Sequence, residues 1–492
     1  MEQGFRSRDP QIVLLSLYGA ATGVNERSVP FVLEVLTSDE PALQLAALAQ
    51  LAQVDTDLAH DAIYDAMRSD YLAVRMEAAY WMAVKRMPQA TSQLEALMEK
   101  ADPEAKRYFA ELFALEGSEP SMQALRKLLF DADPSVRLEA ILHTPVNEAD
   151  DIGALLRTKA RARACPEQEA LAIALGELHD AEARTLLEQI ALSAHGTARL
   201  SALFSLARLG DVEALRTLEQ EAERGNCFAI SSLGALPSCT KAVLIEAMQH
   251  ADPEVRVNAT MALLQQRDAR ALVGIREILV DDPKDCAFQP ASSPGGALSY
   301  TRVTRSAAHN LRDMPMAYEW HVSFREQVLI QAVELPHADF LQLARTLFDY
   351  QAHELIPLLC RLLENIRTPE AIELLQFESQ RLGDPFIRSY AHLALFRMNA
   401  DPAYRAHVTS WIRSNQGTAI FPPRPLLPWR VRLVPAHFQL TLEEKSRLFV
   451  ESLEAIAQCQ DEEAIETLLF TLQQCHETVR PIAAGLLLRA AV

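Results

Sequence analysis

The 492-residue chain has few aromatic residues and no uninterrupted apolar run of about twenty residues. Phe, Trp and Tyr make up 7% of it, and no segment alternates apolar and polar residues between turn signals, so almost no β structure is expected. A membrane-spanning helix is excluded for lack of a long apolar run, and the N-terminus has no basic-then-apolar leader pattern. These absences predict a cytoplasmic protein without a membrane partner.

The motifs of common catalytic and metal sites are also missing. The sequence contains no HExxH, no GxSxG and no Gly-rich phosphate loop. Its 13 histidines, including the isolated His392, form no cluster with cysteines at metal-ligand spacing, and its seven cysteines form no CxxC pair. We therefore expect reduced, mostly buried cysteines and histidines that lie on the surface or in packing positions. No catalytic residue, cofactor site or metal site is predicted, and enzymatic activity stays an open question.

What the sequence does contain is a repeated helix signature, clearest at 252–264. Asp252 is suited to cap the first free amides of a helix, and Pro253 is suited to its first position. Val255, Ala259, Ala262 and Leu263 then fall on one apolar stripe. A single such helix buries little, so the pattern predicts a helix that packs against neighbouring helices.

The signature returns along the whole chain. Aligned on Arg256, it recurs with the same residue types at Arg137 and Arg388, and steps of 31 residues back from Arg137 reach Lys106, Arg75, Gln44 and Val13. A period of about thirty residues is the length of two short helices with their turns, and self-similarity at this period is typical of a solenoid. Each unit is predicted to be one helical hairpin.

The segment 197–215 shows both helices of one unit, with Gly210 placed to end the first in a left-handed conformation. This segment strongly resembles the HEAT-repeat family, most of all the short bacterial variety also found in phycobilisome lyases. The resemblance implies an all-α, right-handed α-α superhelix of the armadillo type. It also implies a ladder of Asp–Arg contacts between successive repeats, at Asp133 with Arg137, Asp252 with Arg256, and Asp384 with Arg388. Gln44 and Glu169 depart from that pattern.

Two irregular segments interrupt the repeats. Residues 281–300 are rich in Pro, Gly, Ser and Asp and are predicted to be an inserted loop. Regular repeats are thus expected over 1–280, and degenerate and terminal repeats over 301–492, in one continuous solenoid. Within the latter, 421–435 contains five prolines and is predicted to cross the solenoid as an extended strap. Both ends of the array lack a polar capping helix, so we expect either an exposed first helix or a preceding segment.

The strap combines an indole with positive charge in a chain of net charge −19. It is our predicted partner-binding site, through Arg424, Trp429, Arg430 and Arg432, and an acidic or phosphorylated protein would be steered there. The alternative is that Trp429 only anchors the strap. Three functions stay open: a scaffold that binds a protein or peptide on its concave face, which we favour, a lyase-like enzyme or cofactor chaperone, and a nucleic-acid binder. The acidic charge argues against the third.

Overall fold

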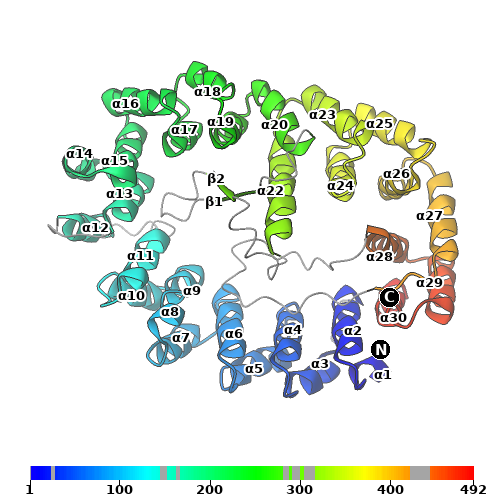
Figure 1. The fold of residues 1–492 in the computed structure, drawn as a ribbon. Coiled ribbons are helices and arrows are strands. Elements are labelled where there is room, and N and C mark those ends of the chain that lie inside the picture. Colours follow the sequence, from blue (N-terminus) through cyan, green and yellow to red (C-terminus); the bar gives the residue numbers. More distant parts are fainter. Residues whose placement is uncertain are drawn as a thin grey trace. The chain divides into compact units, whose positions relative to one another are not determined.

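A computed structural model describes residues 2–23, 28–144, 152–161, 167–280, 287–290, 300–303, 316–420 and 444–491. Within these ranges, helix follows helix along the chain, joined by short turns (Figure 1). The one sheet among the described residues is small and antiparallel, with Ala287 of β1 (Ala287–Pro290) opposite Val303 of β2 (Tyr300–Val303). The predicted fold class, an all-α helical-repeat solenoid, is confirmed. The short sheet lies where the inserted loop was predicted.

The chain divides into two compact units. Unit 1 consists of Met1–Lys100 and Leu363–Val492, and unit 2 is Ala101–Leu362. The helices of unit 1 are α1 (Glu2–Phe5), α2 (Pro10–Gly23), α3 (Val29–Leu36), α4 (Pro41–Leu51), α5 (Asp57–Ala66), α6 (Leu72–Val84), α7 (Ala90–Met98), α25 (Pro369–Ser379), α26 (Pro385–Arg397), α27 (Ala403–Ser414), α28 (Glu444–Ala457), α29 (Glu462–Gln474) and α30 (Arg480–Ala490).

The helices of unit 2, among which η3 and η4 are short 3-10 helices, follow one another along the chain. They are α8 (Pro103–Lys106), α9 (Phe109–Glu116), α10 (Glu119–Leu128), α11 (Pro134–His143), α12 (Ile152–Ala160), α13 (Gln168–Glu177), η3 (Ala181–Ala183), α14 (Arg184–Ser193), α15 (Gly196–Arg208), α16 (Val212–Glu223), α17 (Cys227–Gly234), α18 (Lys241–Ala247), α19 (Pro253–Gln265), η4 (Ala269–Ala271), α20 (Leu272–Leu279), α22 (Met316–Ala332) and α23 (His337–Asp349). The next helix, α24 (Ile356–Ile366), contains the boundary between the units. None of the described helices is long and apolar enough to cross a membrane.

The predicted helix starts are confirmed at the three Asp-Pro positions. An Asp252 carboxylate oxygen accepts a hydrogen bond from the Glu254 amide at 2.9 Å, with Pro253 in the first turn. Asp133 and Asp384 cap α11 and α26 in the same way. The single apolar stripe predicted for α19 is too narrow, however. Residues between the stripe positions are buried as well, because α17, α18, α20, α22 and β2 all pack around this helix.

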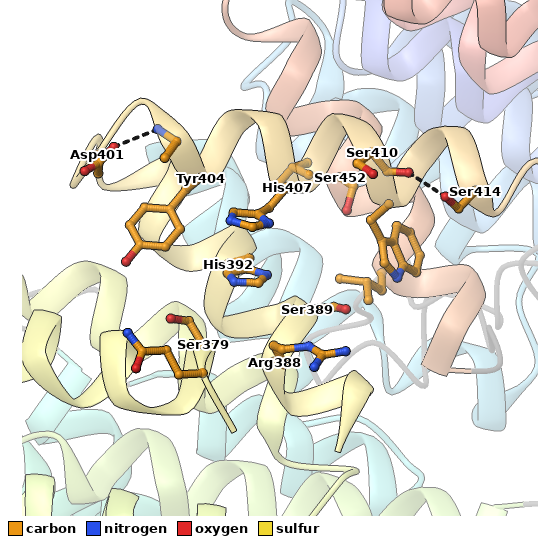
Figure 2. A pocket seen from close by; sticks show the side chains of 15 residues that line it. Ser379, Arg388, Ser389, His392, Asp401, Tyr404, His407, Ser410, Ser414 and Ser452 are labelled. Atoms are coloured by element: carbon orange, nitrogen blue, oxygen red, sulfur yellow. Dashed lines mark hydrogen bonds between the residues drawn. The ribbon is translucent and has the colours of Figure 1, made fainter. Parts of the chain in front are cut away.

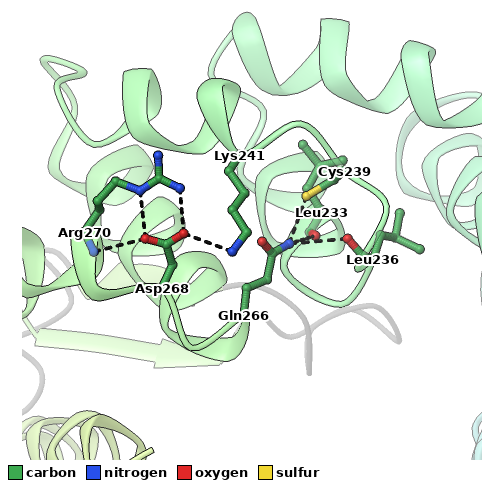
Figure 3. Close-up of polar contacts among 7 residues, drawn as sticks. All are labelled: Leu233, Leu236, Cys239, Lys241, Gln266, Asp268 and Arg270. Atoms are coloured by element: carbon green, nitrogen blue, oxygen red, sulfur yellow. Dashed lines mark hydrogen bonds and ion pairs between the residues drawn. The ribbon is translucent and has the colours of Figure 1, made fainter. Parts of the chain in front are cut away.

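Successive hairpins of unit 2 are tied together at their turns. Figure 3 shows one such tie, where the Asp268 carboxylate accepts from Lys241 Nζ of the preceding hairpin at 2.9 Å and from Arg270. Beside it, Gln266 Nε2 donates to the backbone oxygen of Leu233 at 2.8 Å. The hydrogen bonds from Arg270, with those from Lys241, hold the pKa of Asp268 well below its usual range, although burial opposes this shift. Asp268 and Gln266, both in the turn after α19, therefore hold this hairpin against the preceding one.

The same tie recurs through the unit with other residues. In each case a basic side chain reaches an aspartate 23 to 27 residues further along, in the pairs Lys106 with Asp131, Arg157 with Asp180, Arg184 with Asp211, and Lys241 with Asp268. The last three aspartates each follow a residue with positive φ, namely His179, Gly210 and Arg267. Left-handed Gly210 thus ends its helix as predicted. The role of the aspartate after it was missed by the sequence analysis.

In unit 1, the first and last hairpins of the chain pack against each other. Helix α2 lies along α30, and the two backbones approach so closely that a Cβ at Gly19 would lie 2.3 Å from the Pro481 backbone oxygen. Tyr18 Oη also donates to Glu454 of α28 at 3.2 Å. The expectation of an exposed first helix is therefore wrong, because α30 covers α2 and supplies the neighbour that an end repeat otherwise lacks.

Candidate functional site in unit 1

The four residues predicted to bind a partner lie outside the described residues. Arg424, Trp429, Arg430 and Arg432 all belong to 421–443, which separates α27 from α28. Their partner-binding role stays a prediction. The six residues of the implied ladder are described, and they show how the repeat arginine is used.

At the position aligned with Arg256, the polar side chain of most repeats makes hydrogen bonds within the fold. Arg256 Nη1 donates to the backbone oxygens of His250 at 3.0 Å and Ala251 at 3.1 Å, and its Nε donates to Glu277 of α20 at 2.9 Å. Arg137 reaches the oxygens of Asp131 and Ala132, both at 2.8 Å, and pairs with Glu167. Arg75 donates to two backbone oxygens of the turn before α6, and Gln44 Nε2 donates to the Ser38 backbone oxygen in the turn before α4. Each side chain clamps the turn before its own helix.

Arg388 of α26 is the exception. Its guanidinium has no hydrogen-bond or ion-pair partner among the described residues, and its side chain is half-buried. It lines a cavity of about 690 Å³ instead. A half-buried guanidinium carries five N–H donors and a permanent charge, so leaving it unpaired is unfavourable unless a ligand or water satisfies it. Arg388 is therefore a half-buried repeat arginine that the described part of the fold leaves unpaired.

The cavity is built from four helices of unit 1. It is polar and rich in hydroxyl groups, and its lining comprises Ser379 and Gln380 at the end of α25, Arg388, Ser389 and His392 of α26, Asp401, Ala403, Tyr404, His407, Val408, Ser410, Trp411 and Ser414 on or beside α27, and Leu448 and Ser452 of α28. Figure 2 shows these side chains converging from α26 and α27, with Arg388, His392 and His407 following one another.

Two histidines of the lining stack on each other. The His392 and His407 rings are stacked, with centroids 4.4 Å apart and planes 6° from parallel. Tyr404 lies beside them, its ring centroid 5.9 Å from that of His392. Burial, with the neighbouring His407 and Arg388 charges, lowers the pKa of His392 to about 4, so this ring is neutral at pH 7. A neutral imidazole presents one N–H donor and one acceptor to the cavity.

A hydroxyl group of α28 also lines the cavity. Ser452 is 2% exposed as a residue, and no hydrogen bond joins its hydroxyl to a described residue. Ser452 is therefore a second polar group of the lining that the described part of the fold leaves without a hydrogen bond. Asp401 is the only acid among the described lining residues, and one of its oxygens already accepts from the Ala403 amide at 2.7 Å. The described lining therefore has more unpaired hydrogen-bond donors than negatively charged groups.

This arrangement is suited to binding an anionic group rather than a metal. No group of three or more His, Cys, Asp or Glu side chains able to hold a metal ion occurs among the described residues. The cavity combines a guanidinium, imidazole N–H groups and hydroxyl groups with aromatic surfaces on Tyr404 and Trp411. Such donors bind carboxylates and phosphates, and aromatic rings beside them pack against the rest of a ligand.

The sequence indicates only part of this site. Its pattern predicts Arg388 as a ladder residue and His392 as an isolated histidine, whereas in the structure His392 stacks on His407. One signal was available, since residues four apart such as Arg388 and His392 lie on one face of a helix. Nothing in the sequence indicated that His407 of the next helix would complete the pair.

Comparison with known proteins gives only distant structural matches. No family model matches the sequence, and no curated protein matches it. Among solved structures, the complex of CpcE and CpcF of phycocyanin lyase from Nostoc sp. PCC7120 is 18% identical over 44% of this chain and 92% of that chain, with a TM-score of 0.33. An engineered protein is 17% identical over 81% of this chain and 98% of its own, with a TM-score of 0.27.

A further similar structure is that of Kap95p bound to RanGDP. It is 12% identical over 96% of this chain and 70% of that chain, with a TM-score of 0.30. At these identities the function has to be inferred from the side chains of this chain itself.

Proposed function

We propose that this protein is a non-catalytic scaffold, built of HEAT-type repeats of the short bacterial variety, that binds a peptide segment of a protein partner. The docking site is the cavity among α25, α26, α27 and α28, called here the Arg388 cavity. The observation that carries this proposal is the guanidinium of Arg388, which has no hydrogen-bond or ion-pair partner in the part of the chain that the structure describes. At the same repeat position, Arg75, Arg137 and Arg256 are engaged in the fold.

The size and lining of the cavity support a peptide ligand. A volume of about 690 Å³ lies within the range of small-molecule and side-chain pockets and exceeds what a single small ion fills. Trp411 and Tyr404 provide amphipathic rings, which binding hot spots favour, beside a cation. An acidic side chain of the partner would pair with Arg388, and neighbouring residues would pack on the rings.

Selection of peptides against the full-length chain tests this function. A random peptide library displayed on phage is expected to yield binders whose affinity falls about 10- to 100-fold in Arg388→Ala, the range for losing charge-assisted hydrogen bonds. The melting temperature should hardly change, because Arg388 clamps no turn. Arg413→Ala is the matched control, since Arg413 is an exposed arginine on α27 that does not line the cavity.

Failure to enrich any peptide, or enriched peptides that bind Arg388→Ala as well as the unchanged chain, would contradict this function. The strap is tested separately. If Arg424, Trp429, Arg430 and Arg432 also bind the partner, Arg430→Glu with Arg432→Glu should abolish peptide binding at an unchanged melting temperature.

The lyase-like and nucleic-acid alternatives, and the repeat boundaries at 280 and 300, stay predictions. Tetrapyrrole absorbance and a labelled-DNA shift test the first two.

A further inference from the structure

We propose that the Arg388 cavity is a phosphate-recognition site, which takes a phosphorylated side chain of the bound peptide with Arg388 as its anchor and His392, His407 and Ser452 as further donors. This inference rests on the proposed function and adds the chemistry of the ligand. It requires that the donors suit a phosphate better than a carboxylate, and that no internal carboxylate already occupies them.

The number of free donors favours a phosphate. A carboxylate has two oxygens, and one bidentate arginine occupies about half of their acceptor sites. The cavity offers more than that, because the imidazoles of His392 and His407 and the Ser452 hydroxyl make no hydrogen bond to a described residue. A phosphate monoester carries three strong acceptor oxygens and a charge of about −1.5 to −2, so its acceptor capacity matches this larger number of donors better than a carboxylate does.

The charged groups of the cavity are few and of both signs. Around His392, the charged and titratable groups of the lining are Arg388 on its own helix, His407 and Tyr404 of α27, and Asp401, which precedes α27. The lining residues from α25 and α28 are Ser379, Gln380, Leu448 and Ser452, none of which carries a charge. An anion paired with Arg388 thus meets a single described acid of the lining, and one oxygen of that acid already accepts from the Ala403 amide.

Binding of a phosphate should therefore change the protonation of the cavity. In the free protein, burial and the nearby cations keep His392 neutral. A bound dianion offsets the charge of Arg388 and favours the protonated imidazole, so the pKa of His392 should rise from about 4 on binding. This shift provides a readout of site occupancy that does not depend on the identity of the partner.

The test uses the full-length chain with two probes. The first is inorganic phosphate, with the histidine side-chain NMR signals followed against pH. The second is a set of three pools of degenerate peptides that are identical except for a central phosphoserine, serine or glutamate. The phosphoserine pool should bind about 10- to 100-fold more tightly than the other two and raise the pKa of His392. Arg388→Ala should remove both effects, and Arg413→Ala should remove neither.

The other outcomes separate this inference from the proposed function. Equal binding of the three pools, with loss in Arg388→Ala, would refute phosphate recognition and leave a peptide-binding cavity. A His392 shift with inorganic phosphate but no binding of any pool would refute recognition of a phosphorylated peptide and peptide binding together. His392→Gln keeps a side-chain N–H donor and gives a second check, because it should retain most of the phosphoserine preference while removing the NMR signal assigned to His392.

Discussion

The packing of α2 on α30 permits a quantitative test of how the first and last hairpins stabilise unit 1. A Cβ added at Gly485 would lie 1.9 Å from the Gly19 backbone oxygen and 2.6 Å from its carbonyl carbon. These are backbone atoms, so they cannot move aside as a side chain would. Gly485→Ala therefore forces the two helices apart by roughly 1 Å before the contact becomes tolerable.

The expected effect is the balance of two contributions. Overpacking a well-packed contact costs about 1–3 kcal/mol, and a clash with backbone atoms belongs at or above the upper end of this range. Replacing Gly by Ala inside a helix contributes about 1 kcal/mol in the opposite direction through helix propensity. We expect Gly485→Ala to destabilise the contact between α2 and α30 by about 2 kcal/mol.

Hydrogen exchange measured by mass spectrometry is the suitable assay, because repeat arrays open locally and need not unfold in one step. A loss of about 2 kcal/mol should accelerate exchange of peptides from α2 and α30 by about 30-fold. Gly417→Ala is the control, since no atom lies within 4 Å of a Cβ built there. Unchanged exchange in α2 and α30 of Gly485→Ala would refute the inferred contact.

Further predictions concern the repeat contacts. Arg256→Ala should lower the free energy of unfolding by about 1–3 kcal/mol, since Glu277 and two backbone oxygens lose their donor. Arg388→Ala should hardly change the free energy of unfolding. Equal denaturation midpoints for the two variants would contradict this contrast. Asp268→Asn should lower the melting temperature at pH 7 by roughly 3–10 °C. Because the pKa of Asp268 in the folded chain lies below its unfolded value of about 3.9, the stabilisation is complete above that value and is lost as the pH falls, so melts should converge between about pH 5 and pH 2. A difference that stays constant down to pH 2 would exclude this linkage.

The fold was largely predictable, because local chemistry determines where the helices begin. Asp252 followed by Pro253 caps a helix whatever its surroundings, and Gly210 is left-handed because its turn requires positive φ. The partners of each helix were less accessible. Nothing near Gly19 in the sequence indicates Gly485, since a repeat pattern specifies contacts between neighbours and says nothing about contacts between the ends.

The site was harder still to predict, because it depends on a contact that is not made. Arg388 has the same sequence surroundings as Arg137 and Arg256, including the Asp-Pro start, yet only the latter two donate to the turn before their helix. In α26 that turn contains Gly383 at φ +95°, and Arg388 points to the cavity lined by α27 and α28 instead. In a repeat protein, the side chains at equivalent positions usually make equivalent contacts. A side chain that does not make them, such as Arg388, is therefore a candidate for binding. Arg388 lies four residues before His392, which stacks on His407 of the next helix.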